Sequence, residues 1–307
     1  MSQQQYNLIV VLGATASGKT RLGVNLAKQL DGEVISGDSR QVYTGLDIGS
    51  GKDLAEYDNV PYHLIDIIEP GKEYNAFQFQ RDFFNVFKDI NQRNKLPLLV
   101  GGTGLYIDAV VAGYEFVQLD KNMPQRELFA EMALEDVQKI LLELDSQSYT
   151  ATDITARPRL YRAIEIAQHA ASQTAPVTKT VLPEIKPLYF GIKWDRSELR
   201  QRITLRLKER LEHGMIEEVE GLLAQGITHE KLEYLGLEYR FVSQYIEGKI
   251  SYDEMFDILN IAIHKYAKRQ DTWFRRMERQ GATIHWLDGT GDINKQAQVV
   301  LNQFQRS

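Results

Sequence analysis

Cysteine is absent from the 307-residue sequence, so neither a disulfide framework nor a cysteine-based zinc site can form. No run approaches the roughly 18 consecutive apolar residues that a membrane-spanning helix needs. Residues 1–7 carry no basic side chain, and the apolar run Leu8–Leu12 is too short for the core of a signal peptide. We therefore expect a cytoplasmic protein that has no membrane association and needs no obligate protein partner.

A basic excess is also absent, because 36 lysines and arginines stand against 42 acidic residues, a net charge of −6. This balance argues against a protein that coats nucleic acid indiscriminately. It leaves room for a local basic face, so charge has to be examined segment by segment. Hydrophobic residues make up 43% of the chain and charged residues 25%, values that fit a globular protein with a sizeable core.

Short apolar runs alternate with amphipathic stretches in the first third of the chain. The predicted strands are Leu8–Leu12, Glu33–Ser36, Tyr62–Ile67 and Leu96–Val100, and the predicted helices are Thr20–Leu30 and Ala76–Arg93. Asn75 and Gln78 resemble a capping box at the start of the second helix. This alternation predicts an α/β fold with a P-loop NTPase-like parallel sheet flanked by helices. Ligands of such sheets bind at the carboxyl ends of the strands.

Residues 117–184 differ from their surroundings because they predict helices and almost no strand. The helices expected there are Gln125–Met132, Leu134–Asp145 and Arg157–His169, followed by a loop at Ala170–Thr180. We therefore predict a small helical insertion domain, 117–184, within a core made of residues 1–116 and 185–307. The later part of the core should contain the strands Pro187–Trp194 and Thr283–Leu287 and the helices Ser197–Glu212, Ile216–Ala224, Lys231–Ile246 and Tyr252–Arg279.

A phosphate-binding loop is the most specific motif, since it matches G-x-x-x-x-G-K-[ST] at every fixed position and joins a predicted strand to a helix. Its residues are Gly13, Ala14, Thr15, Ala16, Ser17, Gly18, Lys19 and Thr20. Backbone amides of such a loop turn toward phosphate oxygens, and the helix N-terminus adds positive potential. Lys19 can neutralise phosphate charge, and the Thr20 hydroxyl can bind Mg²⁺. We predict that these eight residues bind a diphosphate or a nucleotide, with Mg²⁺ as cofactor.

A polar hexapeptide, Asp38-Ser-Arg-Gln-Val-Tyr43, directly follows the second predicted strand. We expect this strand to neighbour the strand of the phosphate loop, which would place Asp38 near the phosphates or a metal ion. Ser39, Arg40 and Gln41 carry donors and acceptors of the kind that recognise a base edge. Taken alone, the segment is equally compatible with a polar loop in which Asp38 is a helix N-cap.

A glycine-rich hexapeptide, Gly101-Gly-Thr-Gly-Leu-Tyr106, follows the fourth predicted strand. Its glycines allow a ligand to approach the backbone closely, and Thr103 can donate a hydrogen bond to a base or a phosphate. A tight turn into the next helix is an equally good interpretation of this hexapeptide alone.

The phosphate loop and the two hexapeptides together resemble the tRNA dimethylallyltransferases, also called tRNA isopentenyltransferases. The resemblance continues in Gly45-Leu-Asp-Ile-Gly49 with Lys52, Pro61-Tyr-His-Leu-Ile-Asp66, Lys265-Tyr-Ala-Lys-Arg-Gln270 and Thr272-Trp-Phe-Arg-Arg276. Two segments depart from the family pattern. Gly49-Ser-Gly-Lys52 replaces the usual Gly-Thr-Ala-Lys, with Asp53 in place of a proline. Arg159 and Arg162 match Gln-Arg-x-x-Arg, with Pro158 in place of the glutamine.

The resemblance implies transfer of a dimethylallyl group from dimethylallyl diphosphate to N6 of the adenosine 3′ of the anticodon, tRNA position 37. It implies Lys19, Asp38 and Thr103 as catalytic residues, with Asp38 accepting the N6 proton. Arg206, four residues after Arg202 on one predicted helix face, is expected to contact the diphosphate, although a solvated helix face is the alternative. Contacts to the tRNA anticodon loop are expected from Asp38, Ser39, Arg40, Gln41, Thr103, Arg159 and Arg162.

The end of the predicted helix Tyr252–Arg279 is strongly basic. Six cations fall within an arc of about 120° on a helical wheel. We call them the basic face: Lys265, Lys268, Arg269, Arg275, Arg276 and Arg279. An apolar arc lies beside it, formed by Ala262, Ile263, Tyr266, Trp273, Phe274 and Met277, with Ile261 as the exception inside the cationic arc. Such a one-sided arc favours a phosphate backbone as partner, so we expect Lys265, Lys268, Arg269, Arg275 and Arg276 to bind tRNA. A merely solvated face is the alternative.

Three other functions stay open at this point. A small-molecule P-loop kinase explains the loop and the sheet but not the basic helix. A prenyltransferase for free adenine nucleotides would act on AMP or ATP without tRNA. A non-catalytic RNA-binding protein is disfavoured by the intact Lys19, Thr20, Asp38 and Thr103.

Overall fold

The computed structural model describes residues 5–114, 116, 119, 121–172 and 182–306. The chain divides into two compact units, which we call the core unit, Met1–Tyr114 with Pro183–Ser307, and the second unit, Glu115–Leu182. None of the helices described is both long and apolar enough to reach across a membrane.

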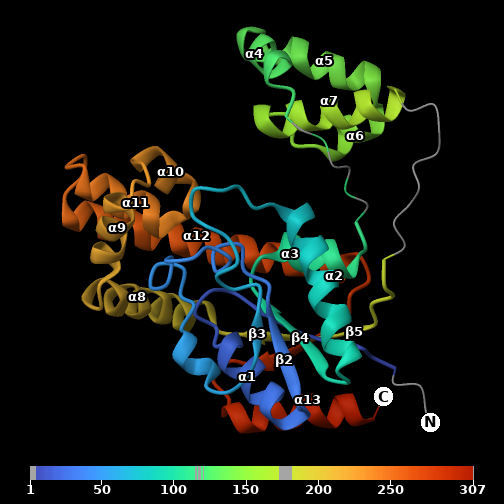
Figure 1. Cartoon of the computed structure of the whole chain (residues 1–307), viewed down its shortest axis with the longest axis vertical. Helices are drawn as coiled ribbons and strands as arrows, with labels where there is room; N and C mark the ends of the chain where they lie inside the picture. The colour runs from blue at the N-terminus through green and yellow to red at the C-terminus, as the bar shows by residue number, and fades with distance from the viewer. Residues whose placement is uncertain (1–4, 115, 117–118, 120, 173–181, 307) are drawn as a thin grey trace. The chain divides into compact units, whose positions relative to one another are not determined.

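The core unit is built on a six-stranded parallel sheet in the order β3-β2-β4-β1-β5-β6. Its strands are β1 (Leu8–Gly13), β2 (Gly32–Ser36), β3 (Tyr62–His63), β4 (Leu96–Gly101), β5 (Pro187–Lys193) and β6 (Ile284–Asp288). Strands β2, β3, β4 and β5 are labelled in Figure 1. Every residue of β1 is buried, as expected for a central strand covered on both faces. The register places Val10 of β1 opposite Leu99 of β4 and Tyr189 of β5.

The prediction that β2 lies next to β1 in the sheet is wrong, because β4 pairs with both strands and lies between them. Helix α2 (Ala76–Gln92) returns the chain from the edge strand β3 to this position. The predicted strand Tyr62–Ile67 is also too long. Leu64 and Asp66 have φ values of 61° and 54°, which no strand residue adopts, so β3 ends at His63.

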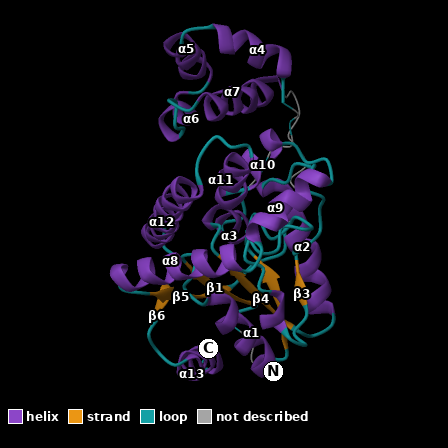
Figure 2. Ribbon diagram, turned by 90° about the vertical axis from the view of Figure 1, so that its left-hand side faces the viewer, coloured by secondary structure: helices purple, strands orange, loops and turns teal. Residues whose placement is uncertain are grey.

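Helices cover both faces of the sheet (Figure 2). On one face α1 (Lys19–Leu30) and α13 (Ile293–Gln305) share a core with the strands. On the other face α2 begins with the predicted capping box, since the Asn75 side chain accepts from Gln78 N and the Gln78 side chain accepts from Asn75 N. Helix α3 (Gly104–Val111) packs against α2 and α12. Helix α3 begins at Gly104, in agreement with the alternative interpretation of the glycine-rich hexapeptide as a turn into a helix, whereas α13 and the short 3-10 helix η1 (Leu54–Tyr57) were not predicted.

Five consecutive helices of the core unit pack around a second hydrophobic cluster. They are α8 (Arg196–Glu212), α9 (Met215–Ala224), α10 (His229–Leu235), α11 (Leu237–Ile246) and α12 (Tyr252–Arg279). The predicted single helix Lys231–Ile246 is wrong, because Gly236 at φ 149° and ψ 173° breaks it into α10 and α11. Only glycine adopts such a backbone readily.

The second unit is helical, with α4 (Met123–Glu131), α5 (Leu134–Leu144), α6 (Ser146–Ala151) and α7 (Arg157–Ser172). It has its own hydrophobic core, formed by residues that include Phe129, Val137, Leu141, Leu160 and Ile164. Helix α7 continues to Ser172, into a stretch predicted to be a loop, and residues 173–180 of that loop lie outside the described part.

Candidate active site

The phosphate loop joins β1 to α1 and is held by side chains from distant elements. Gln270 of α12 accepts a hydrogen bond from Thr15 N at 2.9 Å, and Trp194 donates to Ser17 O at 3.0 Å. Arg202 of α8 donates to Ala16 O at 3.0 Å. Positive φ angles at Ala16 (62°) and Gly18 (92°) turn the loop into the helix. These contacts fix the loop, as a binding site for a polyanion requires.

Only some side chains of the phosphate loop are exposed where a ligand could contact them. Ala14 and Ser17 are 3% exposed, and a Cβ on Gly13 would lie 2.6 Å from Ser17 Oγ, so the serine hydroxyl faces the base of the loop. Ala14 and Ser17 can therefore contact a phosphate through their main chain alone. Gly18, Lys19 and Thr20 instead line a cleft of about 380 Å³.

This cleft is bounded by three segments that lie far apart in the sequence. Its other lining residues are Ala16, Arg21, Asp53, Glu56, Arg202, Leu205, Arg206 and Glu209. The predicted diphosphate contact Arg206 therefore lies at the same cleft as Lys19 and Thr20. A larger cavity of about 740 Å³, lined by Tyr6, Asp108, Tyr189 and others, holds none of the predicted site residues, and we do not assign the chemistry to it.

Lys19 stands in a strongly polar environment. Burial lowers its pKa to about 8, and the Asp38 carboxylate opposes this shift. The positive charges of Arg206 and Arg210 act in the same direction as burial. The lysine therefore lies near two carboxylates, Asp38 and Asp53, and two guanidinium groups, and an added anion would stabilise its charged form.

Asp38 lies two residues after the end of β2, and residues 39–42 form a turn rather than a helix. The helix N-cap interpretation is therefore wrong. Asp38 Oδ1 instead accepts from Arg40 N at 2.9 Å, which stabilises the turn. Although β4 separates β2 from β1, the carboxylate is close enough to Lys19 to affect its pKa.

The two hexapeptides contact each other directly. Thr103 Oγ1 accepts from Ser39 N at 3.1 Å, and Thr103 N donates to Gly37 O at 3.2 Å. Because adjacent parallel strands end at one edge, the turn after β2 and the turn after β4 meet there. Thr103 is thereby fixed beside the Asp38 turn, and Ser39 and Arg40 are half-buried there.

The glycines of the second hexapeptide pack against protein, so the prediction that they admit a ligand is wrong. A Cβ on Gly101 would lie 2.3 Å from Gly37 O, and one on Gly102 would lie 2.3 Å from Gln270 Nε2. A Cβ on Gly104 would lie 2.3 Å from the Trp273 ring. The absent side chains let the Asp38 turn and helix α12 approach β4.

Gln41 is buried, and both ends of its amide are used inside the protein. Its Oε1 accepts from Ser36 Oγ at 2.7 Å, and its Nε2 donates to Gly51 O at 3.0 Å. These contacts give Gln41 a structural role, and its predicted role in reading a base edge stays a prediction. Gln41 connects the end of β2 to the loop of residues 44–53.

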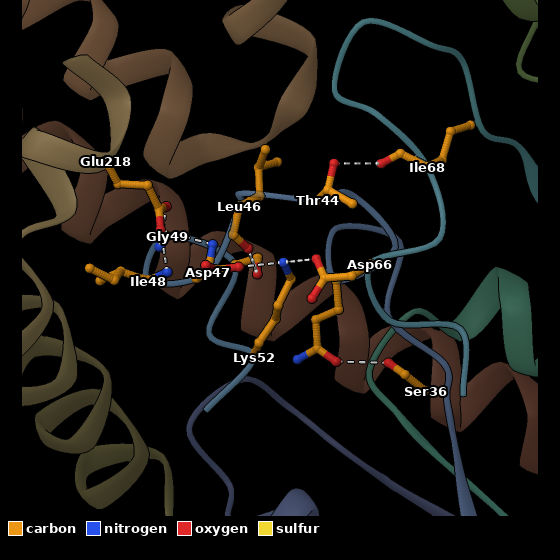
Figure 3. A network of polar contacts seen from close by, with 12 residues as sticks. Ser36, Thr44, Leu46, Asp47, Ile48, Gly49, Lys52, Asp66, Ile68 and Glu218 are labelled. Carbon is orange, nitrogen blue, oxygen red and sulfur yellow. Dashed lines mark hydrogen bonds and ion pairs between the residues drawn. The ribbon is translucent and has the colours of Figure 1, made fainter. Parts of the chain in front are cut away.

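Lys52 anchors the same loop from within (Figure 3). Its side chain is fully buried, and Nζ forms ion pairs with Asp47, at 2.5 Å, and with Asp66. Glu218 of α9 accepts from the backbone amides of residues 47, 48 and 49, at 2.8, 2.6 and 3.0 Å. The loop that ends at Asp53 is thus fixed by charged side chains on two sides.

Lys52→Met should lower the free energy of unfolding by about 1.5–3 kcal/mol, because two carboxylates lose their charged hydrogen-bond donor. Urea denaturation measures this change. Lys72→Met is the matched control, since Lys72 is exposed and pairs with an exposed Glu69. Equal losses in the two variants would contradict a special role for the buried ion pairs.

Arg206 and Arg210 come from successive turns of α8 and meet residues 49–53. Arg206 forms an ion pair with Asp53, and Arg210 donates to Gly49 O at 3.3 Å. Arg210 also lies 3.9 Å from Glu238 of α11. Burial lowers the pKa of Arg210 and raises that of Glu238.

The sequence patterns did not predict that Arg210, Glu238, Gln270 and Asp53 belong to this region. The spacing of Arg202, Arg206 and Arg210 at every fourth residue was an available signal for Arg210. No local signal marks Glu238, because the break at Gly236 creates its position.

The basic face of α12 is exposed at all six positions. The opposite side of the helix is buried, and its buried residues include Ile263, Ala267, Gln270, Phe274 and Met277. Ile261, the predicted exception, is 52% exposed. Two of the cations lie over aromatic rings, with Arg269 5.6 Å from the Tyr266 centroid and Arg276 5.2 Å from that of Trp273.

The remaining predicted tRNA contacts, Arg159 and Arg162, belong to the second unit. Arg159 is exposed and pairs with Asp153 at 2.9 Å. Arg162 is half-buried and donates to Leu119 O at 3.0 Å. Arg162 therefore also has a structural role in the unit.

A parallel sheet whose first strand runs into a phosphate loop defines a P-loop protein of the α/β class. Comparison with family models is more specific. The IPP transferase model matches residues 41–277, and the isopentenyl transferase model matches residues 6–58. The chain belongs to the IPP transferase family.

Individual relatives agree with this assignment. The tRNA dimethylallyltransferase 2 of Shewanella sediminis is 68% identical over 298 residues, which cover 97% of this chain and 98% of that protein. The full-length tRNA isopentenylpyrophosphate transferase of Bacillus halodurans is 32% identical with a TM-score of 0.71, covering 98% and 97% of the two chains. A eukaryotic dimethylallyltransferase acting on tRNA is similar in fold, with a TM-score of 0.82 at 22% identity, covering 98% of this chain and 80% of that one.

Proposed function

We propose that the protein transfers a dimethylallyl group from dimethylallyl diphosphate to N6 of adenosine 37, the nucleotide 3′ of the tRNA anticodon. The relatives' names support tRNA as the acceptor. The observation that carries the proposal is that Lys19 lines a cleft with Thr20 and Arg206, while the Asp38 carboxylate lies close enough to Lys19 to raise its pKa. A proton acceptor and a diphosphate site must lie this close if one carbon is to move between the two substrates. We place the reaction in the cytoplasm.

The chemistry assigns distinct tasks to the two residues. The N6 amine is a weak nucleophile because its lone pair is delocalised into the adenine ring. It needs an electrophilic carbon, and an allylic carbon that loses diphosphate supplies one. Negative charge then develops on the diphosphate, where Lys19, Arg206 and the loop amides stabilise it. Asp38 accepts the N6 proton, and Thr103 positions the base, while the target adenosine leaves its stack to reach them.

Magnesium would fit this cleft as an ion held by one protein hydroxyl and by substrate oxygens. Thr20 lines the cleft next to Lys19. Among the described residues, no group of three or more His, Cys, Asp or Glu side chains is arranged to hold a metal ion. Mg²⁺ keeps several waters and uses few protein ligands when it binds phosphates, so the Thr20 hydroxyl is sufficient. The ion would neutralise charge on the departing diphosphate.

The basic face of α12 is the proposed contact for the tRNA backbone, together with Arg159 of the second unit. Replacing Lys268, Arg269 and Arg276 by Ala should weaken tRNA binding. The slope of log affinity against log salt should become shallower by up to about 0.7–0.9 per lost phosphate contact. Affinity titrations at several salt concentrations measure it.

Replacing the exposed Lys28, Lys72 and Lys88 by Ala removes the same charge from other surfaces and serves as the control. An unchanged salt slope in the α12 variant, or an equal change in the control, would show that the basic face is only solvated.

One assay tests the function as a whole. Purified protein receives labelled dimethylallyl diphosphate and either tRNA or AMP as acceptor. Label in tRNA at N6 of adenosine 37 supports the proposal. Transfer to AMP without tRNA would instead establish a nucleotide prenyltransferase, and absence of transfer to both would reject prenyl transfer.

A further inference from the structure

Two guanidinium groups converge on residues 49–53 beside the phosphate loop. A Cβ on Gly51 would lie 1.6 Å from Arg210 Nη2 and 2.8 Å from Arg206 Nη2, so both arginines occupy the space next to its backbone. Within the cleft, the ion pair of Arg206 is with Asp53. Arg206, the predicted diphosphate contact, is therefore already paired with a carboxylate of the protein.

The backbone around Asp53 is held in a conformation that L residues rarely adopt. Asp53 has φ 48° and Gly51 has φ 65°, both in the left-handed region. Lys52, between them, is fully buried and paired with two carboxylates. Asp53 O accepts from Glu56 N at 2.9 Å at the start of η1. The neighbours thus hold Asp53 against Arg206.

The charges of the cleft give this contact a consequence for an incoming polyanion. Lys19, Arg202 and Arg206 line the cleft, and Asp53 lines it with them. A diphosphate placed against Arg206 would lie close to the Asp53 carboxylate, and like charges at that distance repel each other. Binding must then exchange one anionic partner of Arg206 for another.

We propose that Asp53 competes with the diphosphate group for Arg206 and thereby promotes release of the diphosphate product. The inference rests on the proposed function, because that function supplies the diphosphate. Lys19, Arg206 and Arg210 are three neighbouring cations that repel one another. Without diphosphate, Asp53 reduces this repulsion because it pairs with Arg206. After transfer, Asp53 recovers Arg206 and weakens the hold on inorganic diphosphate.

The test is Asp53→Asn, which keeps the shape of the side chain and removes its charge. Binding of inorganic diphosphate at fixed Mg²⁺ is measured by calorimetry and does not require prenyl transfer. Because the ion pair is partly exposed, we expect a modest effect, with the dissociation constant lower by about 3- to 10-fold. Steady-state turnover should fall relative to the single-turnover rate, since product leaves more slowly.

Two controls isolate the mechanism. Asp58→Asn removes an equal charge from a neighbouring residue that also has a positive φ, 50°, but pairs with Lys28 outside the cleft. It should leave diphosphate binding unchanged. In an Arg206→Ala background, Asp53→Asn should tighten binding much less, because the competition for Arg206 is gone and only the direct repulsion between Asp53 and diphosphate is relieved.

Three results would overturn the proposal. Unchanged diphosphate affinity in Asp53→Asn would show that the ion pair is only structural. Weaker affinity that excess Mg²⁺ restores would make Asp53 a metal ligand. Tighter binding of the same size in Asp58→Asn would reduce the effect to general charge. If the wild-type protein does not transfer a prenyl group to tRNA, the proposed function is contradicted. The measured affinity for inorganic diphosphate still tests the competition between Asp53 and diphosphate.

Discussion

Asp38→Asn is expected to slow single-turnover prenyl transfer to tRNA by about 10²–10⁴-fold, the usual cost of removing a general base. The amide cannot accept the proton that N6 loses. It can still accept the hydrogen bond from Arg40 N, so the turn after β2 should persist. Affinity for tRNA and for dimethylallyl diphosphate should change little, because the missing interaction matters in the transition state.

The same substitution has a second, electrostatic effect that the experiment must separate. The Asp38 carboxylate raises the pKa of Lys19, opposing burial. Without it the pKa of Lys19 falls below about 8, and the lysine loses its charge at lower pH. Rates should therefore be compared over a pH series, at values where Lys19 is protonated in both proteins. A shifted pH profile with no loss of maximal rate would assign Asp38 to tuning of Lys19 alone.

A Mg²⁺ series completes the comparison for Asp38. If Asp38 only stabilises the turn, Asn replaces it and the rate stays near that of the wild-type protein. If it binds the metal, excess Mg²⁺ should partly restore the variant. Either outcome would contradict the role as base.

Features fixed by local sequence could be predicted. The phosphate loop depends on glycines between an apolar run and a helix, and the capping box at Asn75 depends on residues three apart; both signals are contained in a short segment. The alternation of strands and helices likewise predicted the parallel sheet. Its strand order was not predictable from the same signals, because the insertion of β4 between β2 and β1 is a contact between distant segments.

The predicted functions of individual polar residues depended on where their side chains point. Gln41 and Arg40 are neighbours in sequence, yet Gln41 is buried with both ends of its amide bonded, while Arg40 is half-buried. The glycines after β4 were expected to meet a ligand, and they meet Gly37, Gln270 and Trp273 instead. A glycine shows that something approaches closely, and only the structure tells whether it is ligand or protein.

Lys19→Ala is expected to lower the turnover number by at least about 10²–10³-fold, the range for loss of one preorganised donor to developing negative charge. Lys19 begins α1 at the cleft, beside Asp38 and Arg206. Lys28→Ala on the last turn of the same helix removes an exposed charge paired with Asp58 and should have little effect. Turnover near the wild-type value in steady-state assays would exclude this role for Lys19.

The pH dependence should identify Lys19 as the source of the effect. Its pKa of about 8 in the free protein means that kcat/KM of the wild-type protein falls as the pH rises through this value, because the cation that holds the diphosphate is lost. Lys19→Ala, although slower, should lack this alkaline decline.

The free energy of unfolding gives a complementary check. At neutral pH the buried Lys19 carries a charge, and this lowers the free energy of unfolding because burial disfavours the charged form. The loss disappears as the pH rises from about 8 toward the ordinary pKa of 10.5, where the lysine is neutral in the folded and in the unfolded protein. The variant should therefore unfold at neutral pH with a free energy equal to or above that of the wild-type protein. Lost turnover then reflects the missing charge at the diphosphate, whereas a lower free energy of unfolding would trace it to a damaged fold.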